Sequence, residues 1–168
     1  MSSRKIRVVR KTILVVGEGL AEVALAQQLK ATYTRDGNGC AMTIRNARGK
    51  GGRHVIDYAA RQMRASEFTT VCAVLDTDTD WDQEVEAIAR RSGIEVVAND
   101  PCLEAMLLRV HGVAAGRTTA DCKRLFKDRF GGEAHDAGII SRHFQRGHLD
   151  GARGSVESLD RLMTLIEI

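Results

Sequence analysis

The residues best suited to chemistry are acidic and follow two short apolar segments of the chain. Glu18 comes after one such segment, and the run Asp76, Asp78 and Asp80 comes after the other. Carboxylates that converge repel one another unless a cation lies between them, and their hard oxygens suit Mg²⁺ or Mn²⁺ better than a soft metal. Residues two apart in extended backbone face the same side, so Asp76 and Asp78 could share one ion. We therefore predict a metal site formed by Asp76 and Asp78 together with Glu18.

Other interpretations of these acidic motifs can be compared with the sequence. A calcium loop starting at Asp76 would need Gly and Glu where Trp81 and Ala87 stand, so this interpretation fails. The G-x-G-x-x-G dinucleotide motif also fails, because Glu22 occupies its third glycine position, and no Walker A motif is present. Turn and capping chemistry stays open for the acidic run, since Asp80 or Asp82 could cap the helix that follows.

A glycine-rich basic segment lies between the two acidic motifs. It contains three closely spaced glycines and the basic residues Arg45, Arg48, Lys50 and Arg53. Glycines allow backbone amides to approach an anion, and the cationic side chains could bind phosphates without reading base sequence. The segment could equally be a solvated loop.

Apolar patterning predicts the elements that must position these groups. We expect strands at 12–16, 41–45, 70–75 and 94–98 and helices at 21–33, 55–64, 83–91, 103–110 and 120–130. This βαβαβαβα order predicts an α/β fold with a parallel sheet of about four strands covered by helices on both faces. Ligands of such sheets bind beyond the carboxyl ends of the strands, where both acidic motifs fall. The segment 131–154 gives no clear prediction.

The last segment of the chain has apolar residues at helical spacing. Val156, Leu159, Met163 and Ile166 follow one another at intervals of three and four, which indicates an amphipathic helix. We expect this stripe to pack on the domain's own sheet. The alternative is the seam of a homodimer, and spacing alone cannot separate the two.

Length and composition limit the class of protein. The chain has 168 residues, 43% hydrophobic and 28% charged, which fits a single globular domain over 1–168. Its net charge of +3 neither requires nor excludes a nucleic-acid partner. Only 4% of the residues are aromatic, which is few for a surface on which bases stack. Four cysteines without CxxC spacing, and an apolar run too short for a signal peptide or a membrane span, predict a cytoplasmic protein.

Three blocks resemble the RloB-like proteins of the TOPRIM superfamily. ILVVGEGLAEVAL is similar to their opening IVxEGxTE motif, VCAVLDTDTD to their strand ending in D-x-D, and NDPCLEAMLLRVHG to their third block. The glycine pair 51–52 also falls between the first two blocks, as in those proteins. The resemblance covers about residues 12–112 and leaves 113–168 as a helical C-terminal extension. Several apolar and aromatic positions of the family differ here, but no acidic residue is lost.

This resemblance implies a function as well as a fold. In the superfamily the first-strand glutamate is the general acid/base and the D-x-D pair binds Mg²⁺, roles that would fall to Glu18, Asp76 and Asp78. The expected activity is Mg²⁺-dependent cleavage of phosphodiester bonds in DNA or RNA. RloB-like proteins are associated with bacterial restriction and phage-defence loci, often beside an ATPase. The alternative is a non-catalytic metal-binding or regulatory subunit of an ATPase-containing complex.

Four further residues are candidates for a supporting role around this site. Glu22 lies one helical turn after Glu18, and could face the site or solvent. Asp80 ends the acidic run. Glu104 and His111 lie seven residues apart on one face of a predicted helix that Asn99 or Asp100 would cap ahead of Pro101, its first residue. A capping or surface glutamate and a core histidine are the alternatives for this pair.

Overall fold

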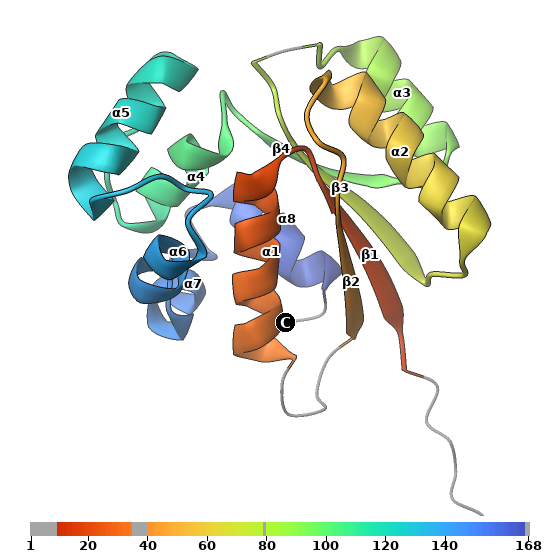
Figure 1. Ribbon diagram of the computed structural model, residues 1–168, viewed down its shortest axis with the longest axis horizontal. Coiled ribbons are helices and arrows are strands. Elements are labelled where there is room, and N and C mark those ends of the chain that lie inside the picture. The colour runs from red at the N-terminus through yellow and green to blue at the C-terminus, as the bar shows by residue number, and fades with distance from the viewer. Residues whose placement is uncertain (1–9, 35–39, 79, 167–168) are drawn as a thin grey trace, which may run out of the picture.

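A computed structural model describes residues 10–34, 40–78 and 80–166 and has a central sheet of four parallel strands (Figure 1). The strands are β1 (Thr12–Gly17), β2 (Ala41–Asn46), β3 (Thr70–Asp76) and β4 (Glu95–Asn99), in the order β2-β1-β3-β4. All three strand pairs are parallel, so the carboxyl ends of the strands lie at one edge of the sheet. The predicted α/β fold with a four-stranded parallel sheet is confirmed.

Helices follow the strands in the predicted order. They are α1 (Leu20–Tyr33), α2 (Gly51–Ala65), α3 (Gln83–Arg91), α4 (Leu103–Val110), α5 (Thr119–Phe130), α6 (Ala137–His143), α7 (Arg146–Ala152) and α8 (Glu157–Leu165). The prediction placed the start of α2 four residues too late, because it followed the apolar spacing and ignored the glycines at the start of the helix. The pair α6 and α7 lies in the segment 131–154, for which no element was predicted.

The sheet separates two hydrophobic layers. In Figure 1, α2 and α3 cover one face, and α1 with α4–α8 cover the other. Successive residues of β1 alternate between the layers, since Leu14 and Val16 pack against α2 and α3 while Ile13 and Val15 pack on the opposite side. Both faces of every central strand are therefore buried, as expected for a parallel sheet.

The strand order creates a switch point between β1 and β3. The chain leaves β1 toward β2 through α1, and leaves β3 toward β4 through α3, so the two connections run in opposite directions. Because α1 and α3 lie on opposite faces, a crevice is expected between the carboxyl ends of β1 and β3. Gly17 pairs with Val74 at this end of the two strands.

The C-terminal helix packs within the chain. Val156, Leu159, Met163 and Ile166 are all buried, and α8 contacts β4. The expected packing of this stripe on the domain's own sheet is confirmed. None of the helices in the described ranges has the length and apolarity needed to cross a membrane.

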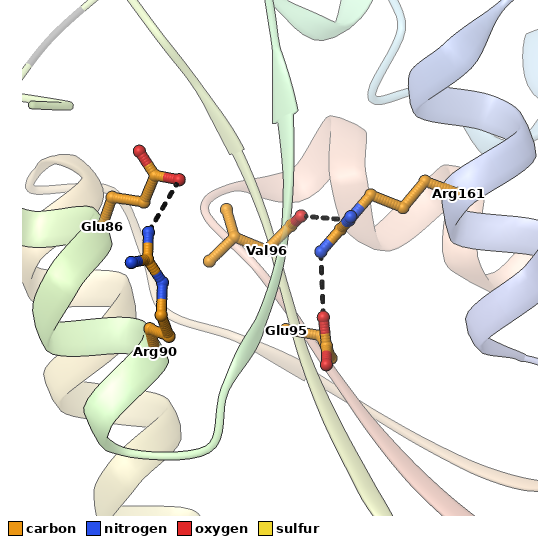
Figure 2. Close-up of polar contacts among 5 residues, drawn as sticks. All are labelled: Glu86, Arg90, Glu95, Val96 and Arg161. Carbon is orange, nitrogen blue, oxygen red and sulfur yellow. Dashed lines mark hydrogen bonds and ion pairs between the residues drawn. The ribbon is translucent and has the colours of Figure 1, made fainter. Parts of the chain in front are cut away.

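The outer edge of β4 is partly covered by the side chain of Arg161 from α8. Its Nε donates to the carbonyl oxygen of Val96 at 2.8 Å, and an Nη forms an ion pair with Glu95 at 2.9 Å (Figure 2). An edge strand presents unpaired carbonyls and amides, and a cationic side chain over them limits pairing with another chain.

Candidate functional site

The two acidic motifs meet at the switch point. The backbone amide of Glu18 donates to the carbonyl of Val74 at 3.0 Å, which extends the β1–β3 ladder by one bond. The carboxylate of Glu18 turns back to the neighbouring strand, where its Oε2 accepts from the backbone amide of Asp76 at 3.1 Å. Glu18 is therefore fixed at the end of β3 although 58 residues separate it from Asp76 in the sequence.

Asp76 joins the sheet to the start of α4. Its Oδ1 accepts from the backbone amide of Leu103, the first residue of α4, at 2.9 Å. The expectation that Asn99 or Asp100 would cap a helix starting at Pro101 is wrong, since α4 starts two residues later and Cys102 precedes it without a side-chain cap. A carboxylate from the end of β3 satisfies the free amide instead, and it also suits the positive end of the helix dipole.

Glu22 and Glu104 complete a group of carboxylates around this point. Glu22 is 6% exposed, and its Oε2 accepts from the backbone amide of Gly19 at 2.8 Å. Glu104 is 8% exposed on α4. Both line a cleft of about 610 Å³ with Glu18 and Asp76. Glu22 thus faces the site and not solvent, and Glu104 is not a surface residue.

The carboxylates raise one another's pKa values. Burial, followed by the charges of Glu22, Glu104 and Glu18, raises the pKa of Asp76 from 3.8 to about 8. Burial also raises the pKa of Glu18, although the bond from the Asp76 amide opposes this, and burial raises the pKa of Glu22. Negative charge in the cleft is therefore largely uncompensated, which is the condition under which a cation or a proton binds.

The aspartates that follow β3 form hydrogen bonds with three different helices. Asp78 Oδ2 accepts from the Thr119 hydroxyl at the start of α5, and Asp80 Oδ1 accepts from the backbone amide of Gly52 in α2. Of the two candidate caps for α3, Asp82 fills the role by accepting from Val85. The alternation of side-chain direction along an extended strand does not continue to Asp78, because β3 ends at Asp76. Among the residues that the structure describes, no three histidine, cysteine or acidic side chains are already grouped as metal ligands.

The donors near Asp76 nevertheless suit a hard cation. Every candidate ligand is a carboxylate oxygen, the type that Mg²⁺ and Mn²⁺ prefer. In register with Asp76 on β4 lies Asn99, which is 1% exposed. Its Oδ1 is the single buried side-chain acceptor in the described ranges without a hydrogen-bond partner. Asn99 was not among the predicted site residues, because its proximity to Asp76 depends on the pairing of β3 with β4.

His111 does not join the carboxylates. Its Nε2 is 2.7 Å from the carbonyl oxygen of His143, and its ring contacts those of Phe130, Phe144 and His148. Burial lowers the pKa of His111, although the hydrogen bond with the backbone of His143 opposes this. The supporting role predicted for His111 is not borne out by this position, because seven residues of helix place it and Glu104 at opposite ends of α4.

The basic loop lies beside Glu18. The amide of Gly49 donates to the carbonyl of Glu18 at 2.6 Å, and the residues from Arg48 to Gly51 all have positive φ between 65° and 83°. Arg45, Arg48 and Lys50 line a hollow that adjoins this contact. Arg53 is separate, since it points to Asp57 one turn along α2 at 3.4 Å. Three of the four predicted phosphate-binding residues are thus brought together.

Comparison of the chain with protein-family models, curated proteins and solved structures finds no match. The assignment of a function therefore depends on the geometry of the cleft and on the chemistry of its side chains.

Proposed function

We propose that this protein is a TOPRIM-type nuclease that cleaves phosphodiester bonds with the aid of Mg²⁺ or Mn²⁺. The observation that carries the proposal is the contact of Glu18 with the end of β3 at Asp76, inside a cleft with two further buried carboxylates. Ligands of open parallel sheets bind at this switch point. The sequence blocks that resemble RloB-like proteins contain these same residues.

Asp76 and Asp78 would hold the metal ion, with the carboxylate of Glu18 beside them. When bound, the ion would neutralise a phosphate and stabilise the charge that develops on its oxygens during cleavage. Each aspartate has one oxygen in a hydrogen bond to the protein, and its second oxygen can serve as a ligand. The hydrogen bonds to Leu103 and Thr119 would hold both carboxylates in place before the ion arrives.

Glu18 would transfer a proton to or from the attacking or leaving oxygen. A general acid/base works best when its pKa lies near the working pH, and burial raises the pKa of Glu18 in that direction. The amide of Asp76 fixes one carboxylate oxygen, so the other is the atom that would exchange the proton. The loop residues Arg45, Arg48 and Lys50 would bind phosphates beside this point.

Metal titration and cleavage assays test this proposal together. Purified wild-type protein would be titrated with Mg²⁺ and Mn²⁺ by calorimetry and incubated with labelled DNA and RNA, with either metal or with chelator. Asp76→Asn and Asp78→Asn should lower both metal affinity and turnover. Asp128→Asn, an exposed aspartate on α5, is the matched control and should change neither.

Two results would contradict the proposal in different ways. Metal binding by the wild type without cleavage of any substrate would favour a non-catalytic subunit that works with an ATPase. Unchanged metal affinity in Asp76→Asn and Asp78→Asn would make these aspartates capping and turn residues only, consistent with their bonds to Leu103 and Thr119.

A further inference from the structure

The carboxylate cleft has a basic wall that the acidic motifs do not provide. Helix α5 lies at the end of the molecule where the carboxyl ends of the strands and the start of α1 are found (Figure 1). It lines the cleft with Lys123, Arg124 and Lys127, and His135 follows on the same side. The 610 Å³ space is therefore bounded by carboxylates on the sheet side and, on the α5 side, by cationic side chains together with Glu133.

The two kinds of charge do not neutralise each other across the cleft. Arg124 pairs with Asp121 on its own helix at 3.4 Å, and Lys127 lies 3.9 Å from Glu133. No ion pair within the described ranges joins α5 to Glu18, Glu22, Asp76 or Glu104. The side chains of Arg124 and Lys127 are 64% and 65% exposed, so their charged ends stay accessible to a ligand.

A ligand for this cleft must carry negative charge along its length. Lys123 and Lys127 are one turn apart on α5, which places their Cβ atoms about 5–6 Å from each other and allows contacts with successive phosphates of one strand. Leu20 at the start of α1 lines the same cleft and is 62% exposed, the one large hydrophobic residue so exposed among the described residues. An apolar side chain beside a phosphate track can bury part of the face of an unpaired base.

The size of the cleft favours one strand over two. Its 610 Å³ lies in the range of pockets that enclose a small organic ligand, roughly 300–1,000 Å³, which is enough for a short stretch of single strand. A duplex is too broad to enter such a space, since its two backbones flank a major groove about 12 Å wide.

We propose that the α5 side of the cleft binds the phosphates of a single-stranded nucleic acid that lies across the carboxylates, with Lys123 and Lys127 as the main contacts and Leu20 against a base. This inference deepens the proposed nuclease function and depends on it for the purpose of the binding, though the binding itself needs no catalysis. It gives the helical extension, which the resemblance did not cover, a direct part in substrate recognition.

Binding without metal tests the inference separately from cleavage. Fluorescence anisotropy in chelator would follow labelled single strands and duplexes of DNA and RNA over a range of salt concentrations. The variant Lys123→Gln/Lys127→Gln should bind single strands at least tenfold more weakly at low salt. Its slope of log affinity against log salt should be shallower by about 1.4, or about 0.7 for each lost phosphate contact.

Matched variants separate the α5 wall from general charge effects. Arg129→Gln removes a positive charge from the same helix but outside the cleft, and should leave affinity and slope unchanged. Leu20→Ser should weaken binding severalfold without changing the slope, because it removes an apolar contact and no charge. Thermal unfolding by circular dichroism should be the same for all variants, since these side chains are exposed.

The outcomes distinguish this inference from the proposed function. Single-strand binding through α5 in a protein that cleaves nothing would support the inference and contradict the nuclease. Normal metal-dependent cleavage with an unchanged slope in Lys123→Gln/Lys127→Gln would contradict the inference and leave the nuclease standing. Equal or tighter binding of duplexes, or equal losses in Arg129→Gln, would also overturn it.

Discussion

Two hollows of similar size differ in how their charges are arranged. The groove along the outer edge of β4 has a volume of about 730 Å³, slightly larger than the carboxylate cleft. Four of its charged side chains pair with each other, since Arg90 lies 3.5 Å from Glu86 and Arg161 binds both Glu95 and the carbonyl of Val96 (Figure 2). In the carboxylate cleft, acidic and basic groups stand on opposite walls, and four of the acidic groups have no cationic partner in the described ranges.

The comparison of the two hollows shows that the separation of charges, and not the volume of the hollow, distinguishes the candidate site. Paired charges at a surface have already satisfied one another and contribute roughly 0–1 kcal/mol to stability. Buried carboxylates held close together cost free energy until a proton or cation compensates them, as the raised pKa of Asp76 indicates. Buried carboxylates whose pKa values are raised by burial and by one another are expected more often at functional sites than elsewhere. Four predictions test this contrast, from the largest expected effect to the smallest.

Glu18→Gln should have the largest effect. If the carboxyl group transfers a proton, the variant should lower kcat by about 10²–10⁴-fold while keeping most of the metal affinity. The Gln side chain retains an oxygen for the Asp76 amide, so the fold should persist. Single-turnover cleavage with calorimetric metal titration measures both effects. An equally large decrease of kcat in Glu86→Gln, a variant in the β4 groove, would contradict the distinction between the two hollows.

Substitution of the basic loop should have the next largest effect. Arg45→Ala/Lys50→Ala should weaken binding to all single-stranded sequences alike and make the salt slope shallower by about 1.4. Arg53→Ala should leave the slope unchanged, because Arg53 lies beside Asp57 and outside the hollow. Anisotropy titrations at several salt concentrations measure this. An unchanged slope in the double variant would make the loop a solvated segment.

Asp76→Asn should change the pH dependence of stability in metal-free protein. The pKa of Asp76 is raised from 3.8 to about 8 in the folded state, so folding takes up a proton between these values. Its contribution is fully present below pH 3.8, and is lost as pH rises to about 8, because only the unfolded state ionises freely. The variant, which cannot ionise, should therefore unfold a few degrees above wild type at pH 8 and near the wild-type value at pH 4.

Thermal unfolding in chelator at several pH values measures this difference. Asp128→Asn serves as the control and should follow the wild-type profile, because Asp128 is exposed on α5. Parallel profiles for wild type and Asp76→Asn would show that the carboxylates are not in mutual repulsion.

Arg161→Met in the β4 groove should have the smallest effect. Loss of the bonds to Val96 and Glu95 should cost about 0.5–1.5 kcal/mol, which lowers Tm by roughly 2–4 °C for each kcal/mol. Arg90→Met should cost less, because its 3.5 Å pair is one helical turn apart and Arg90 is 76% exposed. Neither variant should change metal or nucleic-acid binding. A large loss of either kind of binding would make the β4 groove part of the site.

Local patterning in the sequence determined most of the elements. The apolar runs that became β1 and β3 predict strands because both of their faces are buried, and α3 has the predicted bounds. Glu18, Asp76 and Asp78 were identifiable because acidic residues directly follow such runs. The segment of α6 and α7 was not predictable, since these seven-residue helices are too short for a periodic pattern and depend on tertiary packing.

The cationic side of the cleft was visible in the sequence only in part. Lys123 and Lys127 lie one turn apart on α5, beside the buried stripe that contains Phe126 and Phe130, a spacing that predicts an amphipathic helix but no partner for its polar face. For Asn99 and Glu22, too, the sequence indicates only the type of element in which each residue lies. Each is a strand-end or helix residue whose burial depends on what lies next to it.

The tertiary structure alone decided which of these residues meet. The order of elements along the chain is compatible with several strand orders, and the order β2-β1-β3-β4 is the reason that the end of β1 faces the end of β3. That adjacency brings Glu18 to Asp76, pairs Asn99 with Asp76 and lets α4 begin on an aspartate from another strand. Side-chain type and local periodicity are properties of the sequence, whereas the free energy that selects one strand order comes from burying both faces of the whole sheet at once.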